Sequence, residues 1–492
     1  MSTTSAVPRS GAGSRANGWV LALLAFAQLI ISLDFNIVYV ALPDIGSKLG
    51  FSAQSLQWVV SAYAVAFGGF LLLGGRASDL LGRRRMFVLA LGLYAASSLV
   101  GGLAGNPGTM VAVRAVQGLG GALLFPATLS LINTLFEEGA PRNRALAVWG
   151  GAGASGLTLG ALLGGFLTGA FGWASVFFVN VPLAGIVALA ALAVIPRDPA
   201  AAERRSFDLP GALTATAGVT LLVYVLVEAP SAGWGSAQMV VCLVLAVLLL
   251  AAFALIESRA ADPLMPLRLF GNRSLAAGMA ITFIFMGTLS ALPYFLTVLF
   301  QSVHGYSAIQ TGLAFLVPSL SIATGTQVGE RMATRIATRT TLFTGLVVAA
   351  VGTAVLAVGI SAHGGYLALV PGLVVAGIGQ GITWTGMWIA AASGVAPGEQ
   401  GIASGMASTT QQIGGAVGLA ILIAVANSGT KGKVGDALHS AMADGTRTAV
   451  FIAAAGVLLG ALVALTLPRR AAAADLPAPA DAPEPAPASS AH

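Results

Sequence analysis

Three ionisable side chains interrupt long apolar stretches of this sequence: Asp34, Arg114 and Glu228. An ionised group in such a stretch costs about 2.5–3.5 kcal/mol on membrane-insertion scales, so it marks a candidate functional position. A buried carboxylate can take up and release a proton, because burial favours its neutral form and a nearby cation its charged form. Asp34 and Arg114 are therefore predicted to couple proton movement to function, with a static ion pair between two helices as the alternative. Glu228 lies beside Pro230 and Trp234 and is expected at an interface with water.

A second group of charges follows the second apolar stretch and predicts a conformational gate. Its members are Gly75, Asp79, Gly82, Arg83, Arg84 and Arg85. An acid that accepts hydrogen bonds in one conformation and releases them in another makes a bistable element. A topology anchor with an incidental acid would explain the arginines but not the whole spacing.

Small and aromatic residues suggest where helices pack and where a ligand binds. Gly156, Gly160, Gly164 and Gly165 place bare backbone on one helix face, which permits either sliding, tight sealing or plain packing. Trp384 and Trp388 share a helix face, as an aromatic wall for a flat ligand or as a packing stripe. The substrate-cavity candidates are Asn36, Tyr39, Gln117, Tyr294, Trp384 and Trp388.

The elements that must position these residues are membrane-spanning helices. Of the 492 residues, 57% are hydrophobic and only 9% are charged, which excludes a soluble multidomain protein. Apolar stretches of about 20 residues or more are long enough to cross a bilayer as helices. We expect fourteen spans near residues 18–42, 53–75, 86–105, 108–136, 143–169, 173–195, 209–229, 236–257, 274–302, 308–329, 340–361, 365–393, 402–427 and 447–467.

The basic residues indicate the orientation of these spans. Nineteen arginines fall on the side of the two termini, four basic residues fall on the opposite side, and Arg114 lies within a span. The positive-inside rule then predicts that both termini are cytoplasmic. The same clusters, together with the net charge of +6, indicate topology signals and no nucleic-acid surface. Cys242 is the only cysteine, so no disulfide or thiolate metal site is expected.

The expected organisation is two six-helix bundles with two additional central spans between them. The boundaries are an N-terminal tail over 1–17, a first bundle over 18–195, a linker with two spans over 196–272, a second bundle over 273–467 and a disordered tail over 468–492. Pro141 to Gly165 and Pro397 to Gly418 form a faint internal echo. Secondary carriers commonly contain internal repeats with a substrate site where the halves meet.

Several of these segments together resemble the fourteen-span drug:proton antiporters of the major facilitator superfamily. The first-span segment Leu33 to Pro43 is similar to that family's signature, and Gly75 to Arg85 resembles the loop motif between spans 2 and 3. Arg114 to Gly120 resembles the span-4 motif, and Gly156 to Gly165 the span-5 antiporter motif. Trp173, Asn180 and Pro182 lie in a segment similar to the one that usually follows it.

The resemblance implies that Asp34 and Arg114 line a central cavity and couple protons, and that Asp79 and the three arginines control switching. Departures from the family pattern include Leu80, Asn36 and Tyr39, and also Ala161, which replaces the usual proline of the span-5 motif. Without that ring the helix is not distorted, so the sealing role of this span is in question.

The predicted function is proton-coupled export of lipophilic neutral or monocationic small molecules by alternating access. The few buried acids would neutralise about one positive charge. A proton symporter or facilitator that imports a metabolite is the first alternative, and an integral membrane enzyme is the second. Neither clustered acids and histidines nor a nucleotide-binding loop is present, so the proton gradient, without a metal or cofactor, is the expected energy source. The expected setting is a monomer in a bacterial plasma membrane.

Overall fold

The structure is a computed structural model that describes residues 11–52, 55–137, 140–198, 208–260, 263, 267–393 and 400–468. Every regular element in these ranges is helical. The N-terminal helices are α1 (Gly11–Leu49), η1 (Ser55–Gln57), α2 (Trp58–Leu81), α3 (Arg83–Gly102), α4 (Pro107–Leu135), α5 (Ala140–Phe171), α6 (Ser175–Phe178) and α7 (Asn180–Val194). The next two are α8 (Leu209–Ala232) and α9 (Ala237–Arg259).

The C-terminal part begins with η2 (Leu267–Gly271) and α10 (Arg273–Leu289). It continues with α11 (Leu292–Val298), η3 (Leu299–Val303), α12 (Ala308–Ala314), α13 (Leu316–Arg335), α14 (Thr338–Gly359), α15 (Tyr366–Ala392), α16 (Gln400–Asn427) and α17 (Gly435–Ala464). The predicted disordered tail over 468–492 lies outside the described residues except for its first residue, Pro468.

Within the described residues, twelve helical stretches are long and apolar enough to cross a membrane. Two shorter apolar stretches are Ser55–Leu71, which comprises η1 and the first part of α2, and Leu159–Phe171, which lies in α5. The all-helical membrane architecture is confirmed, while the count of fourteen spans stays a prediction. Helix α1 begins at Gly11, before the expected start of the first span, and α17 begins at Gly435, well before the expected residue 447.

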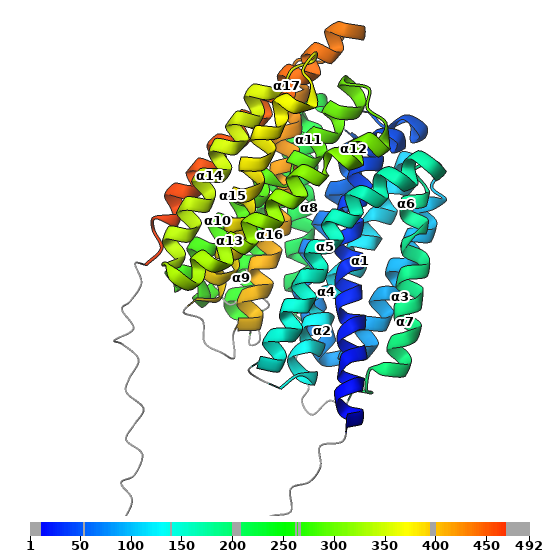
Figure 1. The fold of residues 1–492 in the computed structure, drawn as a ribbon, viewed down its shortest axis with the longest axis vertical. Helices are drawn as coiled ribbons and strands as arrows, with labels where there is room; N and C mark the ends of the chain where they lie inside the picture. Colours follow the sequence, from blue (N-terminus) through cyan, green and yellow to red (C-terminus); the bar gives the residue numbers. More distant parts are fainter. Residues whose placement is uncertain are drawn as a thin grey trace, which may run out of the picture.

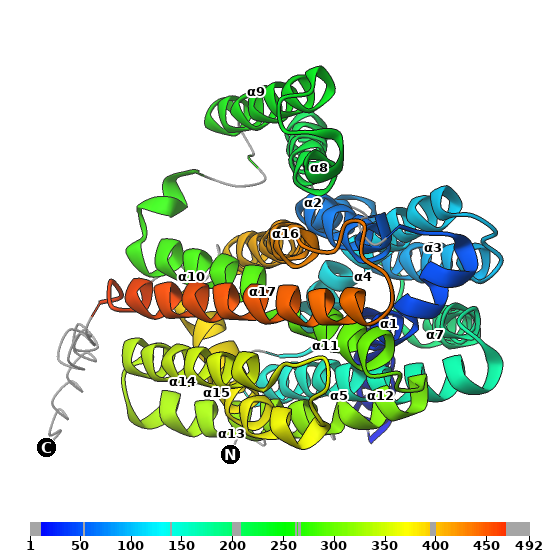
Figure 2. The same cartoon turned by 90° about the horizontal axis from the view of Figure 1, so that it is seen from above.

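The helices form two groups that lie side by side, α1–α7 and α10–α17, as Figure 1 shows. Helix α1 begins and α17 ends towards the lower side of this view, which we call the termini side; the other is the far side. Helices α8 and α9, although central in the sequence, lie at the periphery (Figure 2), where α8 contacts α2 and α16. The most apolar window of α9 has a mean hydropathy of 3.2 and is only 17% buried, as suits a helix that faces lipid.

A row of glycines on α5 fixes the position of α1. A Cβ atom on Gly156 would lie 2.6 Å from the carbonyl oxygen of Leu29, and one on Gly160 would lie 2.4 Å from that of Leu33. At Gly164 the carbonyl of Ile37 is 2.8 Å from the same position. The four-residue spacing on both helices lets backbone pack directly on backbone. Ala161 therefore does not prevent close packing of α5 on α1.

Contacts between the two groups close the far side. The Tyr39 hydroxyl donates to the carbonyl oxygen of Ser290 at 3.5 Å, and Gln301 Nε2 donates to that of Val40 at 2.8 Å. A Cβ atom on Gly165 would lie 2.6 Å from the Ala308 carbonyl oxygen, so α5 and α12 also touch through their backbones.

Candidate functional site

Asp34 lies on α1 and is fully buried among four other helices. Its Oδ2 accepts a hydrogen bond of 2.7 Å from Arg114 on α4, which is also an ion pair. Its Oδ1 accepts from Gln117 Nε2 at 2.9 Å and from Asn180 Nδ2, at the start of α7, at 2.6 Å. The predicted pairing of Asp34 with Arg114 is therefore present, and three donors surround one carboxylate.

Arg114 is held as firmly as the acid it faces. It is 1% exposed; its Nε donates to the Val59 carbonyl oxygen at 2.8 Å, and its Nη1 donates to Gln117 Oε1 at 2.7 Å. The guanidinium carbon lies 4.5 Å from the centre of the Tyr63 ring, within the range of a cation–π contact. These contacts connect α2 and α4 to the buried acid on α1.

Gln117 and Asn180 complete the network by donating hydrogen bonds to Asp34, a role that was predicted from the sequence for neither of them. Gln117 Nε2 also donates to Ser98 Oγ on α3 at 2.9 Å. Asn180 is fully buried, and its Oδ1 has no hydrogen-bond partner among the described residues. An amide at the start of an otherwise apolar span is the signal that could have identified Asn180, because buried polar side chains need partners.

The arrangement is that of a carboxylate surrounded by hydrogen-bond donors and shielded from solvent. Every group that contacts the Asp34 oxygens donates a hydrogen bond, which suits the charged form. The resemblance implied that this pair lines a central cavity; in this structure Asp34 is 0% exposed and faces only its own helix group. Proton exchange at Asp34 therefore requires a rearrangement of these helices.

Part of the predicted gate is held by Asp198, a residue for which no role was predicted from the sequence. Gly82 turns the chain between α2 and α3 with φ of 99°, where a Cβ would lie 2.5 Å from Asp198 Oδ2. The backbone N–H groups of Arg84 and Arg85 donate to the Asp198 carboxylate at 3.1 Å and 3.4 Å. Arg84 also donates from its side chain to the Leu192 carbonyl oxygen.

Asp198 thus acts as a cap for the first turn of α3, supplied from beyond the end of α7. Gly75 lies beside Pro126 of α4, where a Cβ would make an ordinary contact of 3.7 Å. The side chain of Asp79 lies outside the described part of the chain, so its predicted role as a switch stays a prediction.

The six cavity candidates are not brought together. Tyr39 and Tyr294 are buried on the far side, where Tyr39 packs on Phe35 and Tyr294 on Phe295 with edge-to-face rings. Gln117 belongs to the Asp34 network. All three contact other described residues of the protein.

The other three candidates are partly buried. Asn36 lies next to Gly160, whose Cβ would be 3.2 Å from that of Asn36. Trp384 and Trp388 meet edge to face with centroids 6.2 Å apart, and Trp388 packs on buried residues of α10 and α16. This placement favours packing for Trp388.

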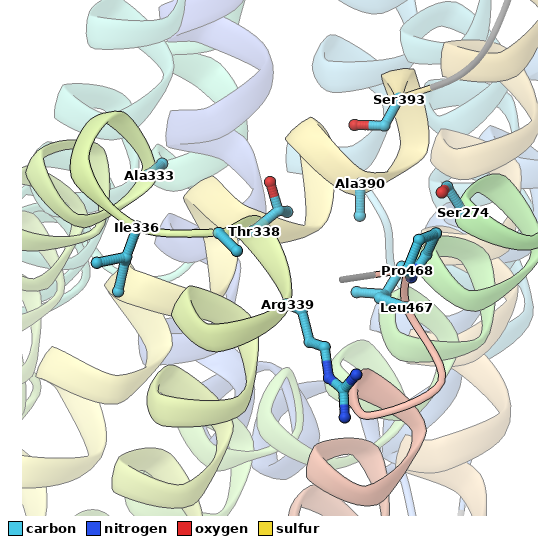
Figure 3. A pocket seen from close by; sticks show the side chains of 10 residues that line it. Ser274, Ala333, Ile336, Thr338, Arg339, Ala390, Ser393, Leu467 and Pro468 are labelled. Carbon is cyan, nitrogen blue, oxygen red and sulfur yellow. The ribbon is translucent and has the colours of Figure 1, made fainter. Parts of the chain in front are cut away.

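A cavity of about 250 Å³ lies away from this site, on the termini side of the second helix group. Figure 3 shows it between the ends of α10, α13, α14, α15 and α17, with Ser274, Thr338, Arg339 and Ser393 among its lining residues. No residue of α1–α7 lines it, so it is not the expected cavity between the bundles.

Comparison with known proteins identifies close relatives of the whole chain. Residues 24–419 match the family model described as Major Facilitator Superfamily. The chain is 39% identical over 449 residues to the puromycin resistance protein pur8 of Streptomyces alboniger, covering 90% of this chain and 89% of that protein. It is 38% identical over 453 residues to the cephamycin export protein CmcT of Amycolatopsis lactamdurans, covering 90% and 92%.

Solved structures share the fold at low sequence identity. A bacterial homologue of the human lysosomal transporter Spinster, solved in an inward-facing and unoccupied conformation, matches with a TM-score of 0.66 and 17% identity over 92% of this chain and 97% of that one. A D-xylose–proton symporter matches with a TM-score of 0.65 and 14% identity over 91% and 97%.

Proposed function

This chain belongs to the Major Facilitator Superfamily, and we propose that it is a proton-coupled transporter that exports lipophilic neutral or monocationic compounds such as antibiotics. The observation that carries the proposal is its likeness, over about nine tenths of its length, to relatives named for puromycin resistance and cephamycin export. These relatives are bacterial, which supports a bacterial plasma membrane as the location.

Proton coupling is assigned to the Asp34–Arg114 pair. A carboxylate held by Arg114, Gln117 and Asn180 is stabilised in its charged form, and loss of any of these donors on a conformational change would favour proton uptake. The pair is sealed in the state described here. Alternating access would open it first to one side of the membrane and then to the other.

The direction of the cycle follows from the proposed orientation. With both termini cytoplasmic, the closed far side is the outer side, and this structure corresponds to a state shut to the outside. Asp34 would receive a proton from outside and release it inside, in exchange for substrate taken from the cytoplasm. We propose a monomer that uses the proton gradient and no cofactor.

The alternatives lose support from the relatives. The names of the similar curated proteins refer to resistance and export, which favours export over uptake of a metabolite. The family is one of transporters, which argues against an integral membrane enzyme.

The test is efflux of puromycin, other lipophilic antibiotics and a cationic dye from cells that express the wild type, Asp34→Asn or Asp44→Asn. Asp44 is a second acid on α1 that is partly exposed and lies outside the buried network, so it is the matched control. We expect the wild type and Asp44→Asn to export at least one compound, and a protonophore to abolish export. Asp34→Asn should reduce gradient-driven export at least about tenfold, which corresponds to about 1.4 kcal/mol.

Two results would contradict the proposal in different ways. Export that depends on the gradient but is indifferent to Asp34→Asn would place the proton site elsewhere. Absence of export for every compound, together with gradient-driven uptake into vesicles of known orientation, would support the importer.

A further inference from the structure

In the buried network around Asp34, the side-chain amide oxygen of Asn180 accepts no hydrogen bond from the described residues. Its Nδ2 donates to Asp34 Oδ1 at 2.6 Å, while its Oδ1 is buried and has no partner in the part of the chain that the structure describes. Asn180 is itself fully buried. Buried polar atoms without a partner are uncommon and call for an explanation.

The partners of Asp34 all suit the carboxylate, and none suits the carboxylic acid. A protonated Asp34 becomes a hydrogen-bond donor and needs an acceptor beside it. Arg114 has no acceptor atom, so the acceptor must come from an amide. Gln117 and Asn180 are the two amides in contact with Asp34.

Gln117 is poorly placed for this role. Its Nε2 donates to both Asp34 and Ser98, and its Oε1 accepts from Arg114, so turning its amide over would break three hydrogen bonds. Turning the amide of Asn180 over breaks the bond to Asp34 and a long contact of 3.5 Å to the Val176 carbonyl oxygen. Rotation of Asn180 is therefore the less costly rearrangement.

We propose that Asn180 is a positioning residue that reads the protonation state of Asp34: it donates to the carboxylate and, after its amide turns over, accepts the proton of the carboxylic acid. The proton stays on Asp34 throughout, and only the hydrogen bond changes direction. Since Asn180 begins α7 and Asp34 lies on α1, the change of partner alters a contact between two helices of the first bundle. The inference rests on the proposed function, in which Asp34 takes up the coupled proton.

The titratable groups around Asp34 come from four helices. Arg114 lies on α4, Tyr63 on α2, Tyr94 on α3 and Tyr39 on α1 itself. The sequence of α5 from residue 150 to 171 contains no titratable side chain, and α7 faces Asp34 with Asn180. The hydroxyls of Tyr63 and Tyr94 interact with each other, and among the described residues neither donates a hydrogen bond to a carboxylate oxygen of Asp34.

The test is infrared difference spectroscopy of the purified full chain in lipid during a pH titration, without substrate or gradient. A protonated aspartic acid gives a C=O stretching band. The band that is absent from the spectrum of Asp34→Asn is assigned to protonated Asp34. Its frequency is lower when the acid donates a hydrogen bond. We expect a low-frequency band in the wild type and a shift to higher frequency in Asn180→Leu and in the smaller variant Asn180→Ala.

Asn427→Leu, which removes a partly buried amide at the end of α16, far from Asp34 in the sequence, is the matched control and should leave the band unchanged. An identical band in the wild type and either properly folded Asn180 variant would overturn the inference, as would the absence of any Asp34-dependent band. Efflux is measured separately. If the band shifts but no compound is exported, the inference about Asn180 stands and the proposed function is contradicted. If export depends on Asp34 but the band does not shift, the proposed function stands and the inference about Asn180 is contradicted.

Discussion

At the scale of single residues, one guanidinium organises the buried site. Arg114 donates to Asp34, to Gln117 and to the Val59 carbonyl oxygen, and it stacks near Tyr63. Removing one partner of a buried ion pair leaves an uncompensated charge and typically costs about 3–5 kcal/mol. We therefore expect the buried site to require the planar geometry of the Arg114 guanidinium group as well as its charge.

Replacement of Arg114 by lysine tests this requirement for geometry. Lysine keeps the charge but cannot donate in three fixed directions or stack in the same way. We expect Arg114→Lys to reduce gradient-driven efflux at least about tenfold and to destabilise the protein by about 2 kcal/mol through the lost hydrogen bonds. Efflux assays and thermal unfolding in detergent measure the two effects.

The matched control is Arg339→Lys, which changes a partly buried arginine at the start of α14, outside this network. It should leave both quantities near their wild-type values. Wild-type efflux by Arg114→Lys would show that charge alone suffices.

At the scale of helices, backbone contact between α1 and α5 determines where Asp34 lies. The contact at Gly160 is made to the carbonyl of Leu33, the residue that precedes Asp34. Overpacking of a tight contact against backbone forces the helices apart, because backbone atoms cannot rotate away as a side chain can. We therefore expect a change in α5 at this seam to displace Asp34 and its hydrogen-bond network.

Alanine substitution at two glycines of α5 separates packing from helix propensity. A Cβ on Gly160 would lie 2.4 Å from the Leu33 carbonyl oxygen, whereas one on Gly151 would meet nothing within 4 Å. We expect Gly160→Ala to destabilise the protein by about 1–3 kcal/mol and to impair efflux. Gly151→Ala should be neutral or stabilising by up to about 1 kcal/mol, because alanine favours a helix. Equal thermal stability of the two variants would contradict the close seam.

The capping of α3 by Asp198 gives a second prediction for a helix. Asp198→Ala removes the acceptor for the backbone N–H groups of Arg84 and Arg85, which should cost about 1 kcal/mol. Hydrogen exchange at these two amides should become faster. Glu330→Ala, which removes an exposed acid from α13, should not change it. Unchanged exchange at Arg84 and Arg85 in Asp198→Ala would rule out the cap.

At the scale of the whole molecule, the far side must open if the two groups of helices rock against each other. Gly169 of α5 faces Ile309 of α12, with a Cβ position 2.9 Å from Ile309 Cγ1. A disulfide between Gly169→Cys and Ile309→Cys, in a Cys242→Ala background, would join the groups there, because Cγ1 is one bond from the Ile309 Cβ and the two Cβ atoms therefore lie within about 4.5 Å of each other, the upper end of the range for a disulfide. We expect oxidation to stop efflux and a reductant to restore it.

The two single-cysteine variants, treated with the same oxidant, are the matched controls for this cross-link and should keep their activity. Full efflux by a completely cross-linked protein would mean that the far side need not open during transport, and alternating access through this seam would be excluded.

The peripheral position of α8 and α9 is also a property of the whole molecule. Both helices are apolar enough to be identified from the sequence, yet only the fold shows that α8 packs along α2 and α16. On α2, adjacent glycines meet the two neighbours: a Cβ on Gly68 would lie 2.6 Å from Gln412 Cβ of α16, and one on Gly69 would lie 2.6 Å from Thr216 Oγ1 of α8. Helix α8 therefore covers a seam between the two groups, where α2 and α16 remain in direct contact with each other.

Sequence alone determined the membrane class and most of the helical segments, and it marked Asp34 and Arg114 as charges within them. Long apolar stretches and the cost of an isolated charge within them are properties of the chain read in one dimension. The sequence also suggested the glycine face of α5 from its spacing, and the structure showed which carbonyl groups it packs against. The placement of the last helix from Gly435 was missed because its first turns are polar.

Only the tertiary structure decided which polar groups complete the site. Asn180, Ser98 and the Val59 carbonyl oxygen come from three different helices, and Asp198 caps α3 from far along the chain. A single amide or hydroxyl in an apolar helix has no periodic signal, and a backbone carbonyl has none in any sequence. Their roles arise from which helices become neighbours, because a hydrogen bond forms only when packing brings donor and acceptor to about 3 Å.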